Sequence, residues 1–101
     1  MTNLQQEEYL ETLITKLKTI LLSKRNDYAF ETDALSNFKV VGNICGIKPE
    51  IACLTLIATK VARLSSLLSE NKLPNNESID DSILDLINYG ILLSMINSES
   101  K

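Results

Sequence analysis

Apolar residues recur along most of the chain at intervals of three and four positions, the spacing that places side chains on one face of an α-helix. This spacing predicts three long helices, Leu4–Ser23, Pro49–Glu70 and Ile79–Asn97. A shorter run predicts a fourth helix from about Ala34 to Asn43. Closely connected helices pack together, so we expect an all-α fold, a compact bundle of three long helices and one short helix. No linker or repeat interrupts the chain, and residues 1–101 are expected to form a single helical domain.

Residues that favour helix ends agree with these boundaries. Asn3 suits the N-cap of the first helix, and Ser78 with Asp81 approximates a capping box before the last helix. Gly46 can adopt the left-handed conformation that ends a helix, and Pro49 suits the first turn of the next one. The connection between the second and third helices is therefore expected to be short.

The helix expected at Pro49–Glu70 is apolar on most of its faces. Such a helix is either central or buries a second face in an oligomer. We therefore expect a homo-oligomer, most commonly a dimer, or a higher assembly. The apolar residues that exceed one core stripe are Leu56, Leu67, Leu92, Leu93 and Met95.

Charge and composition exclude several classes of function. The 101 residues include 10 basic and 13 acidic side chains, and this net charge of −3 argues against a broad surface for duplex nucleic acid. The chain has no histidine, and its two cysteines, Cys45 and Cys53, lack CxxC spacing. Common zinc sites and histidine bases are therefore excluded. A bound metal would have to be a hard cation with oxygen ligands, such as Mg²⁺.

The N-terminal segment does not resemble a targeting signal. Glu7, Glu8 and Glu11 occupy the region where a signal peptide has a cationic start and an apolar run. No stretch of about 18 residues is both apolar and uncharged, so we expect no membrane-spanning segment. The sequence thus predicts a cytoplasmic protein with no membrane partner.

Two positive charges interrupt the apolar pattern of the helix expected at Pro49–Glu70. Lys60 and Arg63 share a face with Leu56 and Leu67 at helical spacing. Their alkyl stems could cover apolar surface while the charged groups reach water. Alternatively, they form an anion site, because the Arg63 guanidinium offers a planar fork for phosphate and Lys60 a point charge.

The last helix carries the complementary negative charges. Asp81, Asp85 and Asn88 follow one line along it, and Asp85 stands in mid-helix, where aspartate is not favoured. Two carboxylates one turn apart repel each other unless a cation lies between them, so we expect the two cations of the preceding helix to face them. Three interpretations remain open: an interhelical salt-bridge network, a Mg²⁺ site formed by Glu77, Asp81 and Asp85, or direct substrate contact.

The segment after the first expected helix combines cations with aromatic rings. Asn26 and Asp27 suit a turn. Lys24 would contact phosphate there, and Tyr28 would stack on or border a base. Alternatively, this is a surface turn whose aromatic rings fold back onto the core. Phe38, in the short helix that follows, is expected to be a core residue.

Five short motifs follow one another between about Ser23 and Leu93. They are Lys24-x-x-Asp27-Tyr28, Asn37-Phe38, Lys60-x-x-Arg63, Glu77-Ser78-Ile79-x-Asp81 and Asp85-Leu86-x-Asn88-Tyr89. In this order they resemble the phage nucleotide-modification-associated domain family. The resemblance implies a short, all-helical phage protein linked to nucleotide chemistry, without naming a reaction.

A more distant similarity is to the all-α nucleoside triphosphate pyrophosphohydrolases of the MazG and dimeric dUTPase type. Those enzymes hold magnesium with Glu-Glu-x-x-Glu on one helix and Glu-x-x-Asp on a later one. This chain contains Glu7-Glu8-x-x-Glu11 and Glu77-x-x-Asp80, but the two motifs are much further apart than in that family.

The charged positions and the resemblance together predict binding of a phosphorylated nucleotide or cyclic nucleotide. The expected binding residues are Lys60, Arg63, Lys24, Asp27, Tyr28 and Asn88.

Two functions remain open at this point. If the protein is a magnesium-dependent phosphoanhydride hydrolase, Asp85 and Asp81 are the catalytic residues and Glu77 completes the metal site. The alternative is a non-catalytic protein that sequesters a nucleotide second messenger of host antiphage immunity. Either protein would act in the host cytoplasm if a phage encodes it.

Overall fold

The computed structural model describes residues 1–28, 33–69 and 76–101, although the side chains of residues 26–28 and 76–78 are outside this description. Its helices are α1 (Asn3–Tyr28), α2 (Ser36–Cys45), α3 (Pro49–Ser69) and α4 (Asn76–Glu99). The predicted fold class is confirmed, because these residues form three long helices and one short helix without a strand.

The start of α1 is held by Thr2 rather than by the predicted cap, Asn3. Thr2 Oγ1 accepts a hydrogen bond from the Gln5 backbone N–H (3.1 Å), and the Gln5 side-chain oxygen accepts one from the Thr2 N–H (2.9 Å). This reciprocal pair is a capping box. Asn3 is already helical, so the predicted N-cap is wrong by one residue.

Two other helix ends also differ from prediction. The turn expected at Asn26 and Asp27 is a continuation of α1, which ends at Tyr28. Similarly, α4 begins at Asn76, so Ser78 lies inside the helix rather than at the predicted N-cap position. Asn, Asp and Ser each disfavour a helix by less than about 1 kcal/mol, which neighbouring turns can outweigh.

The corner between α2 and α3 agrees with its sequence signals. Gly46 adopts the left-handed conformation, with φ 68° and ψ 34°, and α3 begins at Pro49. The Ile47 N–H donates to Gly42 O at 2.9 Å, the long hydrogen bond of a Schellman motif. A Cβ atom on Gly42 would lie only 2.6 Å from Ile47 O, so this close approach requires glycine.

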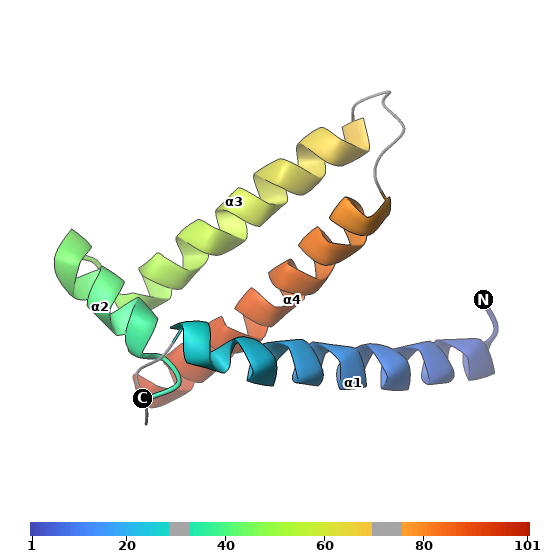
Figure 1. Ribbon diagram of the computed structural model, residues 1–101, viewed down its shortest axis with the longest axis horizontal. Helices are drawn as coiled ribbons and strands as arrows, with labels where there is room; N and C mark the ends of the chain where they lie inside the picture. The colour runs from blue at the N-terminus through green and yellow to red at the C-terminus, as the bar shows by residue number, and fades with distance from the viewer. Residues whose placement is uncertain (29–32, 70–75) are drawn as a thin grey trace.

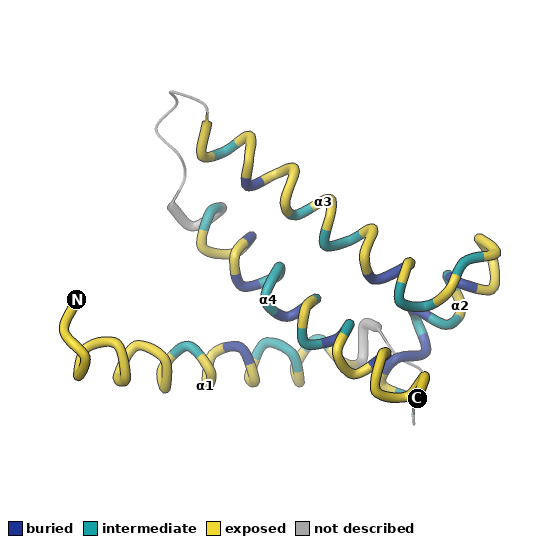
Figure 2. The backbone as a smooth tube through the Cα atoms, turned by 180° about the vertical axis from the view of Figure 1, so that it is seen from behind, coloured by how far each residue is buried: buried dark blue, intermediate teal, exposed yellow. Residues whose placement is uncertain are grey.

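The helices α3 and α4 run antiparallel side by side, and α2 lies across one end of this pair (Figure 1). α1 crosses α4 near its own C-terminal half, and from there its N-terminal half diverges from α4 at an angle. Before Leu17, every residue of α1 except the half-buried Leu13 is exposed (Figure 2). The fold is therefore elongated, measuring 43 × 32 × 24 Å.

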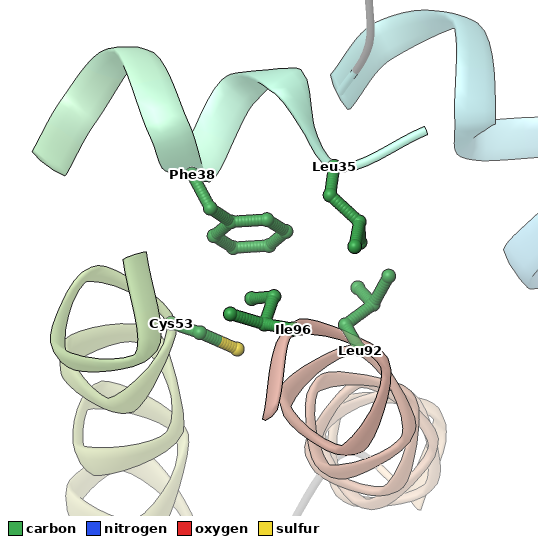
Figure 3. Packing of buried hydrophobic residues seen from close by; sticks show 5 residues of the cluster. All are labelled: Leu35, Phe38, Cys53, Leu92 and Ile96. Carbon is green, nitrogen blue, oxygen red and sulfur yellow. The ribbon is translucent and has the colours of Figure 1, made fainter. Parts of the chain in front are cut away.

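The hydrophobic core lies where α2 meets the ends of α3 and α4 (Figure 3). Phe38 is 1 % exposed, which confirms its predicted core position. Cys53 is completely buried, and its thiol donates to Tyr89 O at 3.4 Å. Burial raises the pKa of the Cys53 thiol, so this cysteine is an unreactive core residue. The buried residues of this cluster are Leu35, Phe38, Cys53, Leu92 and Ile96.

Most of the apolar residues from which an oligomer is predicted are buried or half-buried within the single chain. Leu92 is a core residue, Leu56, Leu67 and Leu93 are half-buried, and Met95 is the exposed member of the five. Other apolar side chains are exposed instead, notably on the outer face of α3. By length and composition alone, α3 is also apolar enough to cross a membrane. Its most apolar stretch of 18 residues has a mean hydropathy of 1.6, and 11 % of that stretch is buried in the fold.

Candidate functional site

One carboxylate of α4 lies between two lysines from different helices. Asp85 Oδ1 is 3.3 Å from Lys24 Nζ of α1, and Asp85 Oδ2 is 3.0 Å from Lys60 Nζ of α3. We call these three residues the Asp85 cluster. Two positive charges and one negative charge leave it with a net charge of +1, and it links all three long helices.

Helical spacing brings these side chains together. Lys24 continues the buried and half-buried stripe of Leu17 and Leu21 along α1. Lys60 is four residues from both Leu56 and Leu64 on the face of α3 that is turned toward α4. Both lysines therefore extend from the edge of the apolar interior, where their stems can pack while the ammonium groups reach a shared carboxylate.

Asp85 remains negatively charged at neutral pH. Burial is the largest single influence on its pKa and raises it, but the hydrogen bonds and charges of Lys60 and Lys24 together outweigh burial. The pKa of Asp85 therefore lies below its ordinary value. A general base works best with a pKa near the operating pH. The pKa of Asp85 is lowered, which moves it further from neutral pH. These properties favour a fixed counter-charge that positions the two lysines.

Arg63 and Asp81 do not join the Asp85 cluster. Both are exposed, and no ion pair holds either of them within the described residues. α3 turns Leu64 inward instead of Arg63, and α4 turns Ser82 inward instead of Asp81. One residue corresponds to a rotation of about 100° around a helix. Lys60 and Arg63 are expected to face Asp81 and Asp85. Among the described contacts, Lys60 pairs with Asp85, whereas Arg63 and Asp81 form no ion pair.

Asn88 lies almost one helical turn beyond Asp85 and is 6 % exposed. Its Oδ1 atom is buried and has no hydrogen-bond partner among the described residues. A buried acceptor without a donor costs about 1–3 kcal/mol. Asn88 therefore has an unused acceptor that a donor from a bound molecule could satisfy.

Three of the predicted site residues, Asp27, Tyr28 and Glu77, have side chains outside the described part of the structure. The proposed Mg²⁺ site therefore has two describable ligands, the exposed Asp81 and the lysine-paired Asp85. Within the described residues, no group of three or more His, Cys, Asp or Glu side chains is placed to hold a metal ion.

A pocket of about 240 Å³ opens between α1 and the beginning of α4. Leu84, in its wall, directly precedes Asp85, and Lys16 lies two helical turns, ~12 Å, before Lys24. Tyr9 provides an aromatic ring and is not among the site residues predicted from the sequence, although Tyr9, Leu13 and Lys16 have the spacing of one helix face. The lining residues are Tyr9, Thr12, Leu13, Lys16, Asp80, Ile83 and Leu84.

A second ionic cluster lies at the other end of α4. Lys39 Nζ is 2.7 Å from Asp33 Oδ2 and 3.1 Å from Glu99 Oε2. The hydrogen bond from Lys39 and that from the Leu35 N–H lower the pKa of Asp33. Its three side chains are 40–54 % exposed and carry a net negative charge, so this cluster is not an anion site and serves as a more exposed comparison for the Asp85 cluster.

Comparison with known proteins gives no match: no family model matches the chain, and no curated protein or solved structure is significantly similar to it. The resemblance to the phage nucleotide-modification-associated family therefore depends on the five motifs alone. Three of those motifs supply one member each of the Asp85 cluster, namely Lys24, Lys60 and Asp85.

Proposed function

We propose that the protein binds a phosphorylated nucleotide or cyclic nucleotide at the Asp85 cluster and holds it without hydrolysing it. The observation that carries this proposal is the engagement of both Asp85 oxygens by ammonium groups from two helices. This arrangement presents a net positive charge while keeping the two cations at fixed positions.

The lysines have donors to spare for a phosphate group. Each ammonium carries three N–H donors, and one on each lysine is directed at Asp85. The Lys24 side chain remains 42 % exposed, so an anion can approach it from solvent. A phosphate oxygen that contacts both lysines would accept charge-assisted hydrogen bonds, which are stronger than neutral ones.

The pocket beside α1 supplies a place for the nucleoside part of the ligand. Tyr9 offers an aromatic face for the nucleotide base, and the Asp80 carboxylate offers acceptors for amino groups of that base. The end of the pocket at Lys16 is ~12 Å along α1 from Lys24, so one nucleotide with more than one phosphate can contact both regions. Asn88 would accept a hydrogen bond from a ligand group that enters between the helices.

The two ion pairs of Asp85 and its lowered pKa favour binding without hydrolysis over magnesium-dependent catalysis. A magnesium ion at this carboxylate would have to displace two ammonium groups, and its positive charge would then lie next to theirs. A carboxylate with a lowered pKa is also a weak base. A protein that holds a nucleotide intact acts by sequestration, and for a phage-encoded protein we propose the nucleotide second messengers of host immunity as ligands.

The experiment that tests this proposal is incubation of the protein with a panel of linear and cyclic nucleotides. Chromatography of the supernatant, with either Mg²⁺ or a chelator present, measures how much of each nucleotide is removed. Denaturing the protein then releases what it holds. Depletion followed by full recovery of the unchanged nucleotide, with or without Mg²⁺, supports the proposal. A new product that forms in Mg²⁺ alone would instead identify a hydrolase, and no depletion of any nucleotide would refute binding.

A further inference from the structure

The face of α3 that points away from α4 carries an unbroken apolar and small-residue seam. Its positions alternate by three and four residues, which is the heptad spacing of helices that pack along their whole length. All six positions are exposed. The seam consists of Ile51, Leu54, Ala58, Val61, Ser65 and Leu68.

The total surface of the chain is larger than that of a typical folded monomer. It measures 7469 Å², whereas a compact protein of this mass exposes roughly 5,700 Å². The excess of about 1,700 Å² is more than the roughly 800 Å² that each partner buries in a standard protein interface. The chain therefore exposes more surface in excess of a compact monomer than one standard interface would cover.

We propose that two copies of this chain pair through the α3 seam with their α3 helices antiparallel. In the register that superimposes all six positions, Leu54 of one copy opposes Ser65 of the other, and Ala58 opposes Val61. Each large side chain in these central layers thus meets a small one. Ile51 and Leu68 close the two ends, where the diverging helices have room for two large side chains.

The seam matches itself in this orientation and not in the parallel one. A parallel, in-register pair would place Ala58 against Ala58 and Ser65 against Ser65, leaving two underpacked layers. Close packing of interfaces disfavours such gaps. A surface that is complementary to its own copy is what a twofold-symmetric dimer requires. The occupant of this face is therefore a second copy rather than a lipid bilayer, for which alternation of large and small residues serves no purpose.

Pairing through the seam leaves the Asp85 cluster accessible. Lys60 is turned toward α4, on the side of α3 opposite the seam. A dimer would therefore hold two separate clusters, and the pairing does not depend on the proposed function. The homo-oligomer remains a prediction, but the proposed interface uses residues other than the four leucines and Met95 named from the sequence.

The test is the solution mass of the wild type and of two matched variants, measured by multi-angle light scattering at micromolar concentration. Leu54→Glu places a charge in the seam, and Leu22→Glu places one on α1, where the native side chain is equally exposed (47 % and 46 %). We expect twice the 11.3 kDa chain mass for the wild type and Leu22→Glu, and the chain mass for Leu54→Glu. Circular dichroism of each sample verifies that the variants remain helical.

Cross-linking tests the orientation, in a Cys45→Ser background because Cys45 is exposed and Cys53 is buried. Mixing Leu54→Cys with Ser65→Cys chains should give disulfide-linked heterodimers under mild oxidation, with little linkage of either variant to itself. Efficient Leu54→Cys self-linkage would refute the antiparallel arrangement. A monomeric wild type, or a dimer unaffected by Leu54→Glu, would overturn the proposal, as would a monomer that binds phosphatidylcholine vesicles through this face.

Discussion

Replacing Asp85 by asparagine removes the charge that holds two lysines in place while nearly preserving the shape of the side chain. A charge-assisted hydrogen bond contributes about 1.5–3 kcal/mol, whereas an exposed ion pair contributes about 0–1 kcal/mol. The 3.0 Å contact with the half-buried Lys60 belongs near the first range, and the 3.3 Å contact with the more exposed Lys24 near the second. We expect Asp85→Asn to lower the free energy of unfolding by about 2 kcal/mol.

A loss of about 2 kcal/mol in a domain of this size lowers the Tm by roughly 8–16 °C. Thermal and urea denaturation at pH 7, followed by circular dichroism, measure the effect. Asp33→Asn is the matched control, because Asp33 also pairs with a lysine, Lys39, but on the open surface. It should change the Tm little. Equal effects of the two substitutions, or an unchanged Tm for Asp85→Asn, would refute the interpretation of the Asp85 cluster as a structural link.

The same variant separates binding from catalysis. If Asp85 is a counter-charge, Asp85→Asn raises the net charge of the cluster from +1 to +2 but no longer fixes the two lysines, so the folded fraction of the variant should still bind nucleotide and should do so without Mg²⁺. If Asp85 were a magnesium ligand or a base, Asp85→Asn would abolish turnover and any metal-dependent binding. Chromatography of the nucleotide mixture after incubation distinguishes the two results, provided that it is performed below the Tm of the variant.

Three further predictions concern pH, backbone packing and helix propensity. Because the folded-state pKa of Asp85 is lowered, its stabilising contribution is complete above the unfolded pKa of about 4 and is lost as pH falls through the folded pKa. The stability difference between wild type and Asp85→Asn should therefore shrink as the pH falls below about 4, and a difference that stays constant down to acid unfolding would contradict this assignment. Gly42→Ala should destabilise the protein, because the new Cβ would lie 2.6 Å from the backbone oxygen Ile47 O. Gly90→Ala should stabilise it by about 0.5–1 kcal/mol, since the position is helical and exposed with no atom near the added Cβ; urea denaturation of both alanine variants checks the opposite signs.

The fold class could be predicted because the helical periodicity agrees with the helix-ending Gly46 and the helix-starting Pro49. Gly46 and Pro49 fix the α2–α3 corner through backbone conformation, which is local. The N-terminus of α1 was less predictable, because Thr2 and Asn3 are both good caps. Only the reciprocal hydrogen bond with Gln5 distinguishes them.

The candidate site was predictable in its residue types but not in its exact partners. Spacing of three or four residues leaves an uncertainty of one position, and that position decides whether Arg63 or Leu64 faces α4. The sequence places Lys24 just after the first expected helix, yet α1 continues past it and brings its ammonium group to Asp85. Contacts between residues 61 positions apart depend on how helices cross, and a single sequence does not contain that information.

The comparison of Lys60→Gln with Arg63→Gln tests the location of the nucleotide site most directly. Both variants lose one positive charge on α3, almost one turn apart, but only Lys60 contacts Asp85. Equilibrium dialysis against the nucleotide panel, with the Tm of each sample recorded, should show binding about ten- to a hundredfold weaker for Lys60→Gln, the equivalent of one charge-assisted hydrogen bond. Arg63→Gln should bind as the wild type does. Equal losses in the two variants, or a larger loss for Arg63→Gln, would contradict a site centred on the Asp85 cluster.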